Sequence, residues 1–323
     1  MAHLGFYLCL LALISSCYGI VASSLSIKLA QLSWSISARH AMIVAWVSVV
    51  SAAGVLWFLL ISRDYSLAYI YKNSSSDLPL FYTITAFWSS LEGSHFFWSL
   101  ILSGVACVSV FTMPKELFTL RPYLEIFLSA LMVWMYFLLV SYSDPFAVHL
   151  PKPSQGLGMN ALLQNPYMAI HPPILFIGYT ALVVPYAYSM AALCYGAISQ
   201  GWLRVMRQWT LVAWVFLTVG IFLGGKWAYV ELGWGGYWGW DPVENSSLVP
   251  WLLTTALIHG LTLQEKTAKL VPVNLALSIL ALFFSFFGTF LTRSGIVVSV
   301  HSFAESDIGK VYVVFLGMLF VLS

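Results

Sequence analysis

Long apolar runs separated by short polar segments dominate this chain, and their lengths predict helices that cross a membrane. A helix needs about 20 apolar residues to span ~30 Å of hydrocarbon. Nine apolar runs stand out, of which the ninth is too short to span: residues 4–24, 41–62, 96–113, 122–142, 172–196, 209–225, 242–264, 272–292 and 311–323. We expect an all-α polytopic membrane protein with about nine transmembrane segments, which is a fragment or is completed by a second chain.

The composition supports a membrane protein. Hydrophobic residues make up 60% of the chain and charged residues 8%, with a mean hydropathy of +0.88, which is too apolar for a soluble domain. The net charge of +2 is too small to indicate nucleic-acid binding. The four cysteines form no CxxC pair, so we expect neither a disulfide nor a cysteine metal site. No Lys or Arg precedes the first run, which favours a retained span over a cleaved signal peptide.

The distribution of Lys and Arg predicts an N-terminus on the outer side of the membrane. This orientation places eight basic residues in the inner loops and six in the outer loops. The long loops are then outside, at residues 62–95, 143–171 and 293–310. In the first of them, apolar residues recur at helical spacing and predict a helix lying at the interface: Phe81, Ile84, Phe87, Trp88 and Leu91.

The segment 226–245 differs from the apolar runs because tryptophan and glycine alternate closely in it. Four of the seven residues from 233 to 239 are glycine, which excludes the interior of a regular helix or strand. Glycines there also let a flat partner approach the backbone and the indoles of Trp234, Trp238 and Trp240. An aromatic belt at the membrane interface is the alternative for any single tryptophan. A belt, however, does not require the fixed spacing W-G-x-x-W-x-W-D.

A helix is predicted to start directly after this segment. Asp241 stands at the cap position, Pro242 at the first helical position and Glu244 at the position of the reciprocal acid. This capping box is by itself a structural explanation for both acids. We interpret Gly224 and Gly225 as the end of the preceding helix, and the segment as a rigid aromatic loop.

Two histidines flank the tryptophan-rich segment on the predicted outer side. His171 lies at the mouth of a span, where Pro172 and Pro173 are interpreted as opening the helix, and His301 follows the eighth run. They could approach a planar ligand from opposite faces, and imidazole is a common axial ligand of haem iron. Position by itself favours surface or capping residues over ligands.

His259 is different because it lies within the seventh run. It follows Ser247, Trp251 and Thr255 at four-residue steps, so we expect it to face the helix bundle rather than lipid. An ionisable residue inside a span suggests a function. The alternative is a neutral histidine bonded to a neighbouring helix.

Two basic residues near the outer interface have two interpretations. Arg293 and Lys226 could meet anionic groups such as haem propionates. Anchoring to lipid headgroups explains them equally, and we prefer it at this point.

Four separated motifs resemble the CcmF family, with its NrfE-type relatives, within the haem-handling proteins that share a tryptophan-rich WWD domain. They are Trp88-Ser-Ser-Leu-Glu-Gly-Ser94, Asn160–Pro166 leading to His171-Pro-Pro173, WGGYWGWDPVEN at 234–245, and Thr289–Gly295 leading to Val300–Ala304. The ending Asp-Pro-Val-Glu-Asn favours CcmF over the related CcsA and CcmC groups.

The resemblance implies roles for individual residues. His171 and His301 correspond to the axial ligands of the haem that is transferred, and Trp234, Trp238, Trp240 and Asp241 to the WWD surface. His259 corresponds to a ligand of a second, permanently bound haem b. The family partner of His259 lies in a later span, beyond residue 323, so either a second CcmF-like chain supplies it or the chain is truncated.

The resemblance also implies a function, namely that of a haem lyase in cytochrome c biogenesis (system I maturation). Haem from the chaperone CcmE would be attached to the CxxCH thiols of an apocytochrome c, with a CcmH-type thiol partner. The site would lie on the periplasmic or intermembrane side of a bacterial or mitochondrial inner membrane. A haem exporter of the same superfamily is the alternative function. A quinone-linked subunit would show two histidines within its spans, and a structural subunit would not need the tryptophan cluster.

These expectations divide the chain into four regions. Residues 1–78 hold the first two spans and an outer loop, and 79–225 an interfacial helix with spans three to six. Residues 226–245 form the WWD haem-binding loop, and 246–323 hold spans seven to nine with the loop that carries His301.

Overall fold

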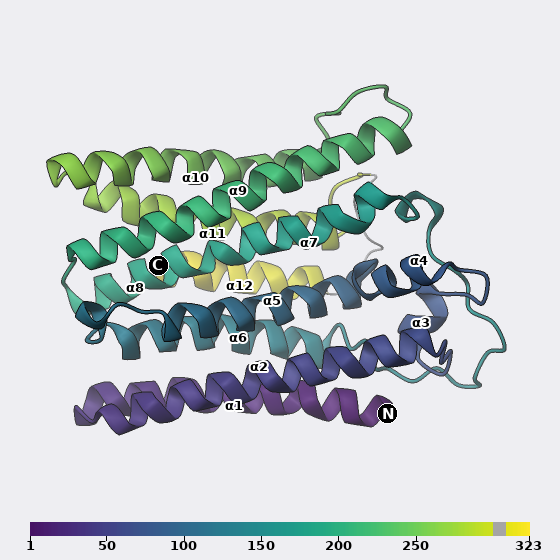
Figure 1. Ribbon diagram of the computed structural model, residues 1–323, viewed down its shortest axis with the longest axis horizontal. Helices are drawn as coiled ribbons and strands as arrows, with labels where there is room; N and C mark the ends of the chain where they lie inside the picture. Colours follow the sequence, from purple (N-terminus) through teal and green to yellow (C-terminus); the bar gives the residue numbers. More distant parts are fainter. Residues whose placement is uncertain (300–307) are drawn as a thin grey trace. The chain divides into compact units, whose positions relative to one another are not determined.

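The fold is known from a computed structural model, in which residues 1–299 and 308–323 are described. Every regular element in these residues is a helix, and one isolated bridge joins Leu67 to Val148. The helices are, in chain order (Figure 1), α1 (Ala2–Leu29), α2 (Leu32–Ile61), α3 (Ala68–Asn73), α4 (Leu80–Thr85), η1 (Ala86–Trp88), α5 (Leu91–Phe111), η2 (Lys115–Leu117), α6 (Arg121–Ser141), η3 (Ala161–Leu163), α7 (Pro166–Ala181), α8 (Val183–Tyr195), α9 (Gln200–Glu231), α10 (Pro242–Thr267), α11 (Val271–Arg293) and α12 (Ile308–Leu322).

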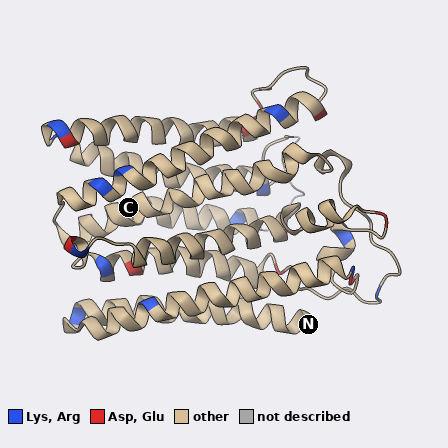
Figure 2. Cartoon of the chain, viewed as in Figure 1, with Lys and Arg blue, Asp and Glu red and all other residues tan. Residues whose placement is uncertain are grey.

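Eight long apolar spans confirm that the chain is a polytopic all-α membrane protein. In the described part of the chain they are α1, α2, α5, α6, α7 with α8, α9, α10 and α11. The ninth run forms α12, which with 15 residues is shorter than a span, as expected. Figure 2 shows that Lys, Arg, Asp and Glu lie mainly towards helix ends and in loops. The direction in which the chain crosses the membrane stays a prediction.

The chain divides into two compact units. The first unit contains Met1–Cys107 and Ser129–Pro173, and the second contains Val108–Leu128 and Ile174–Ser323. In the first unit, α1 and α2 lie side by side as a hairpin (Figure 1). Ala30 closes its turn with a φ of 52°. Both helices bury small residues, namely Ala12, Gly19, Ala22, Ala38, Ala45 and Ala52. Gly19 lies close to α6, because a Cβ there would lie 3.0 Å from Ser129 Oγ.

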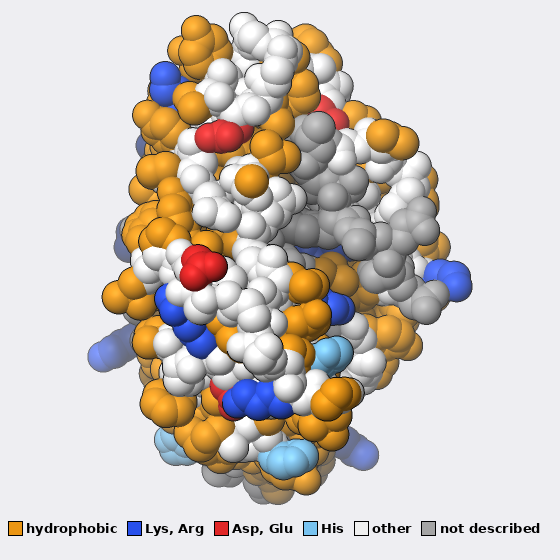
Figure 3. All heavy atoms as spheres, turned by 90° about the vertical axis from the view of Figure 1, so that its right-hand side faces the viewer, with side chains coloured by type: hydrophobic (Ala, Val, Ile, Leu, Met, Phe, Trp, Pro, Cys, Tyr) orange, Lys and Arg blue, Asp and Glu red, His pale blue; other side chains and the backbone are white. Residues whose placement is uncertain are grey.

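The loops of the first unit, residues 62–78 and 143–158, form what we call the loop cap. Backbone bonds join them, from Ala68 N to Ala147 O (2.9 Å) and from His149 N to Ser66 O (2.7 Å). Lys152 Nζ donates to Asp64 Oδ1 at 2.7 Å, and this bond holds the pKa of Asp64 below its ordinary value. Exposed ion pairs contribute little to stability, so the backbone hydrogen bonds are what hold the two loops together. In the end-on view of Figure 3, basic and acidic side chains lie among apolar ones.

The helix predicted from Phe81 to Leu91 forms only in part. Helix α4 ends at Thr85, a 3-10 turn follows, and α5 begins only at Leu91. The hydroxyl of Tyr69 donates to the carbonyls of Ala86 and Phe87. The Phe87 ring is buried and stacks on Trp57 at 4.3 Å. Burial of Phe87 and the two tyrosine bonds therefore outweigh the amphipathic pattern, which placed Phe87 on a lipid-facing stripe.

In the second unit, α7 and α9 approach each other through two glycines. A Cβ atom on Gly178 would lie 2.8 Å from the backbone nitrogen of Leu217, and one on Gly220 would lie 3.0 Å from Leu175 Cα. Small residues at such crossings allow backbones to pack closely in a membrane. The crossing fixes the second half of α7 against α9, whose far end leads into the tryptophan-rich loop.

Replacing Gly178 by Ala should therefore destabilise the protein, because the new methyl group meets backbone atoms that cannot rotate away. We expect a loss of about 1–3 kcal/mol in the free energy of unfolding. The matched control is Gly54→Ala in α2, where a Cβ meets nothing within 4 Å. That change should stabilise by about 0.5–1 kcal/mol. Reversible unfolding in mild detergent measures both, and equal effects would contradict the crossing.

Candidate functional site

The tryptophan-rich segment is partly helical, which corrects the prediction of a loop over 226–245. Helix α9 continues through Gly224 and Gly225 to Glu231, so these glycines do not end it. Gly225 instead makes room, because a Cβ there would lie 2.8 Å from Tyr237 O. The loop proper, which we call the tryptophan loop, comprises residues 232–241. It folds back onto the last turns of α9.

Aromatic stacking holds the tryptophan loop against α9. The rings of Tyr229 and Tyr237 stack at 4.5 Å with an angle of 11° between their planes. The ammonium group of Lys226 lies 5.4 Å and 5.8 Å from the centres of these two rings. Cations within about 6 Å of a ring face are attracted to it. Lys226 thus lies near the rings of Tyr229 on α9 and Tyr237 in the loop, a role that neither sequence interpretation included.

The three tryptophans of the loop have different environments. Trp234 Nε1 donates to Gly236 O at 3.1 Å, and a Cβ on Gly239 would lie 3.0 Å from the Trp234 ring. Trp238 and Trp240 pack edge to face at 6.3 Å. The side chain of Trp240 is 73% exposed, and its backbone φ is positive at 56°. The loop therefore presents a large aromatic surface that the described residues leave uncovered.

The end of the tryptophan loop is pinned by the predicted capping box, which the structure confirms. Glu244 Oε2 accepts from Gly239 N at 2.8 Å and from Asp241 N at 3.3 Å. Asp241 Oδ2 accepts from Val243 N at 2.9 Å. The same Asp241 oxygen accepts from Ser299 Oγ at 2.7 Å. Asp241 therefore joins the loop to the segment that follows α11.

Ser299 stands two residues before His301 in the sequence, and His301 lies outside the described residues. The other histidine predicted on the outer side, His171, is half-buried and belongs to the first unit. The expectation that Pro172 and Pro173 open its helix is wrong. Helix α7 begins at Pro166, and both prolines lie inside it. The side chain of Asn165 caps this start by accepting from Tyr167 N at 2.8 Å.

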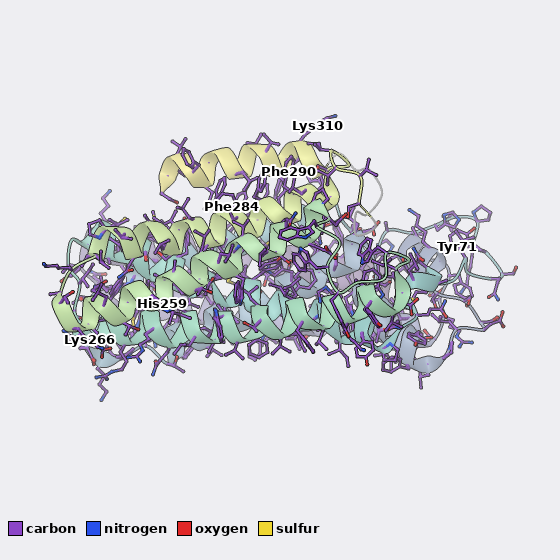
Figure 4. All side chains as sticks on the ribbon, turned by 90° about the horizontal axis from the view of Figure 1, so that it is seen from above. Tyr71, His259, Lys266, Phe284, Phe290 and Lys310 are labelled. Atoms are coloured by element: carbon purple, nitrogen blue, oxygen red, sulfur yellow. The ribbon has the colours of Figure 1, made fainter. Side chains whose placement is uncertain are left out.

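His259 faces outward rather than into the bundle, contrary to the expectation from its spacing. Its ring is exposed. Figure 4 labels His259 on α10, with Lys266 farther along the helix. The Nδ1 atom lies 2.9 Å from Thr255 O, one turn earlier. A carbonyl can only accept, so Nδ1 carries the proton and Nε2 keeps its lone pair for a metal ion. An exposed histidine in an apolar span indicates a site that other residues complete.

Two tryptophan bonds beside His259 were not predicted from the sequence. Trp214 Nε1 on α9 donates to Thr255 Oγ1 at 2.9 Å, and Trp251 Nε1 donates to Thr218 Oγ1 at 2.8 Å. The two indoles stack at 6.3 Å with a 24° angle. They fix the turn of α10 whose carbonyl holds the His259 ring. The four-residue spacing on α10 placed Trp251 and Thr255 on the face of His259. Their hydrogen-bond partners on α9 could be identified only from the packing of the two helices.

Arg293 is buried, with 2% of its surface exposed, which rules out the preferred role as a headgroup anchor. It ends α11, six residues before Ser299. Among residues 1–299 and 308–323, no three His, Cys, Asp or Glu side chains gather as they would around a metal ion. Single imidazoles on separate elements suit a metal that a porphyrin already holds.

The comparisons with known proteins agree with these features. The sequence family "Cytochrome C assembly protein" matches residues 88–298. The chain is 40% identical over 324 residues to the cytochrome c-type biogenesis protein CcmF of Pseudomonas aeruginosa, covering 99% of this chain and 49% of that protein. The chain belongs to the CcmF/NrfE family of cytochrome c assembly proteins. The resemblance drawn from the four motifs is therefore confirmed, and the match begins at Trp88, the first residue of the first motif.

Further similarities within the CcmF/NrfE family cover the whole chain. NrfE of Haemophilus influenzae is 37% identical over 328 residues, covering 100% of this chain and 51% of that protein. A solved structure named "Cytochrome c Heme Lyase CcmF" aligns with a TM-score of 0.86 at 31% identity, covering 99% of this chain and 50% of that one. The chain thus spans about half the length of the curated relatives it matches.

Removal of the Glu244 carboxylate should release the tryptophan loop. Glu244→Ala leaves the amides of Gly239 and Asp241 without their acceptor, which should lower the free energy of unfolding by about 1–3 kcal/mol. Tryptophan emission should also shift to the red as the loop opens. The matched control is Glu265→Ala on the same helix, because the Glu265 carboxylate forms an exposed ion pair with Arg207. An exposed pair should matter by less than about 1 kcal/mol, so equal effects of the two variants would contradict this role of Glu244.

Proposed function

We propose that this chain is the N-terminal half of a haem lyase, the component of cytochrome c biogenesis that attaches haem to apocytochrome c. The observation that carries the proposal is the tryptophan loop, which is pinned by Glu244 and joined through Asp241 to Ser299. This arrangement supports a fixed aromatic surface beside the segment that leads to His301. Membership of the CcmF/NrfE family supports the same function.

The substrate haem stacks on Trp234, Trp238 and Trp240 in this proposal, with His171 and His301 as its axial ligands. The exposure of Trp240 supports the stacking, because a planar apolar group would cover it. Asp241 supports the site indirectly, by tying the loop to the segment before His301. A haem fixed at its iron and its face presents its edge in one orientation.

The reaction itself joins two thiols of a CxxCH motif to the two vinyl groups of haem. Each S–H adds across one C=C bond, so a C–S and a C–H bond form, an S–H bond and a π bond break, and no electrons are gained or lost. The chain contributes orientation rather than a nucleophile. Holding reactants in place is worth many orders of magnitude in effective concentration, and the porphyrin and thiols make the bonds.

His259 fits a resident haem b. Its Nδ1 proton is held by Thr255 O, which leaves Nε2 as the ligand atom on the exposed side of α10. Haem b would supply one-electron transfer that keeps the substrate iron reduced. The Trp214 and Trp251 bonds fix the turn that carries the Thr255 carbonyl, and such outer partners commonly set ligand orientation. The second axial ligand would come from the part of the family's length that this chain does not span.

The partners follow from the family. We propose CcmE as the haem donor, apocytochrome c as the acceptor, a CcmH-type protein as the thiol partner, and a second CcmF-like chain as the completing half. The tryptophan loop would face the periplasm of a bacterium or the mitochondrial intermembrane space, with the N-terminus on the same side. The eight apolar spans support the membrane location.

Loss of either outer histidine should remove the substrate haem. Loss of a residue that only hydrogen-bonds to a metal ligand already lowers metal affinity by about 10–100-fold. His171→Ala and His301→Ala remove proposed ligands themselves. Each should therefore lower the affinity for the substrate haem, called outer haem below, by at least that factor. The control is His149→Ala, because His149 stacks on Tyr71 in the loop cap. Haem quantitation and reduced-minus-oxidised spectra of the assembly measure the effect. Unchanged haem in both variants would rule out these ligands.

His259→Ala should abolish a different pool, haem b, while outer haem remains. The matched control is His40→Ala, an exposed histidine on the membrane helix α2. The α-band of the reduced protein and its midpoint potential distinguish the two pools. If His259→Ala and His40→Ala retained equal haem b, the assignment of His259 would be refuted.

A further inference from the structure

Helix α7 contains a break in its hydrogen bonding just where it carries His171. A proline has no backbone N–H, so it cannot bond the carbonyl four residues earlier. Pro173 therefore leaves the carbonyl of Ala169 without its helical donor. Ala169 is buried, with 5% of its surface exposed, so water does not replace that donor. An unsatisfied buried carbonyl costs about 1–3 kcal/mol.

Trp88 supplies the missing donor. Its indole Nε1 donates to Ala169 O at 3.2 Å, across 81 residues of sequence. Both residues belong to the first unit. The indole thus occupies the place that the N–H of residue 173 would take in an unbroken helix.

The Trp88 ring is itself held firmly. It packs on Phe97 at 5.2 Å and on the edge of Phe87 at 6.5 Å. The turn that carries Trp88 is bonded through the two carbonyls that accept from Tyr69. A donor on such a fixed element can set the position of the carbonyl that it meets.

We propose that Trp88 is a positioning residue for His171. Its indole N–H replaces the N–H that Pro173 lacks, and so fixes the first two turns of α7, on which His171 lies. This proposal rests on the proposed function only for the role of His171 as a haem ligand. The hydrogen bond and its effect on α7 can be tested without haem.

The alternative is that Trp88 only fills space beside the rings of Phe87 on η1 and Phe97 on α5. The two explanations differ in what Pro173→Ala does. Alanine at 173 restores a backbone N–H for Ala169 O. If Trp88 acts through its indole N–H, Pro173→Ala should make that N–H dispensable. If Trp88 acts only by packing, Pro173→Ala should not alter the effect of Trp88→Phe.

The experiment is a double-mutant cycle in the complete haem-loaded assembly: Trp88→Phe, Pro173→Ala and both together. Phenylalanine keeps a ring but removes the donor. Hydrogen exchange of residues 167–175 reads the helix, and the midpoint potential and electron paramagnetic resonance signal of outer haem read the ligand. His171→Ala serves as the reference for loss of the ligand.

We expect Trp88→Phe to speed exchange in this segment about threefold to tenfold and to shift the outer-haem potential and signal. Pro173→Ala should reverse both effects in the double variant. Equal damage by Trp88→Phe in both backgrounds would overturn the proposal in favour of packing. So would unchanged exchange in Trp88→Phe, or an unchanged haem signal where His171→Ala abolishes it.

Failure of the proposed function would look different. In that case His171→Ala would leave outer haem intact, while the exchange measurements would still show rescue of Trp88→Phe by Pro173→Ala. The exchange measurements therefore test the hydrogen bond from Trp88 to Ala169 O. The His171→Ala variant tests whether His171 is a ligand of outer haem.

Discussion

Glu244 accepts hydrogen bonds from the backbone amides of Gly239 and Asp241, and the tryptophan loop depends on this carboxylate. A loop of glycine and tryptophan costs about 1–2 kcal/mol per residue to order and has few backbone bonds of its own. The start of α10 gives the loop a fixed attachment, because the capping box satisfies backbone amides that a helix start otherwise leaves without partners. Asp241 of the same box holds Ser299. Ordinary helix-start chemistry thus organises both sides of the proposed haem surface.

The same constraint acts elsewhere in this apolar chain, since polar backbone groups find few partners in lipid. Where a helix loses an internal bond, a side chain supplies it, as Trp88 does for Ala169 O. At Thr255 a backbone carbonyl instead holds a side chain, because Thr255 O accepts from the His259 ring. The hydroxyl of the same residue accepts from Trp214. Tryptophan therefore occurs here in two settings, as an exposed aromatic face in the loop and as an N–H donor on the helices that carry His171 and His259.

Local patterns predicted the parts of this structure that depend on nearby residues. Run lengths gave the spans, and Asp241 with Glu244 gave the capping box, because both signals lie within one segment. The start of α7 was missed although Asn165 and Pro166 form a local helix-start pattern. The donor to Ala169 O could not be found from local patterns, since Trp88 stands 81 residues away. The break after Thr85 depends likewise on bonds from Tyr69. The outward face of His259 depends on which side of α10 its neighbours cover.

The proposed function requires the tryptophan loop to be a haem-binding surface. A cryo-EM map of the complete assembly purified with haem would show whether it is. We expect a porphyrin lying on the loop, in contact with Trp240, with its iron bonded to His171 and His301. A porphyrin bound elsewhere, with lipid covering Trp240, would contradict it.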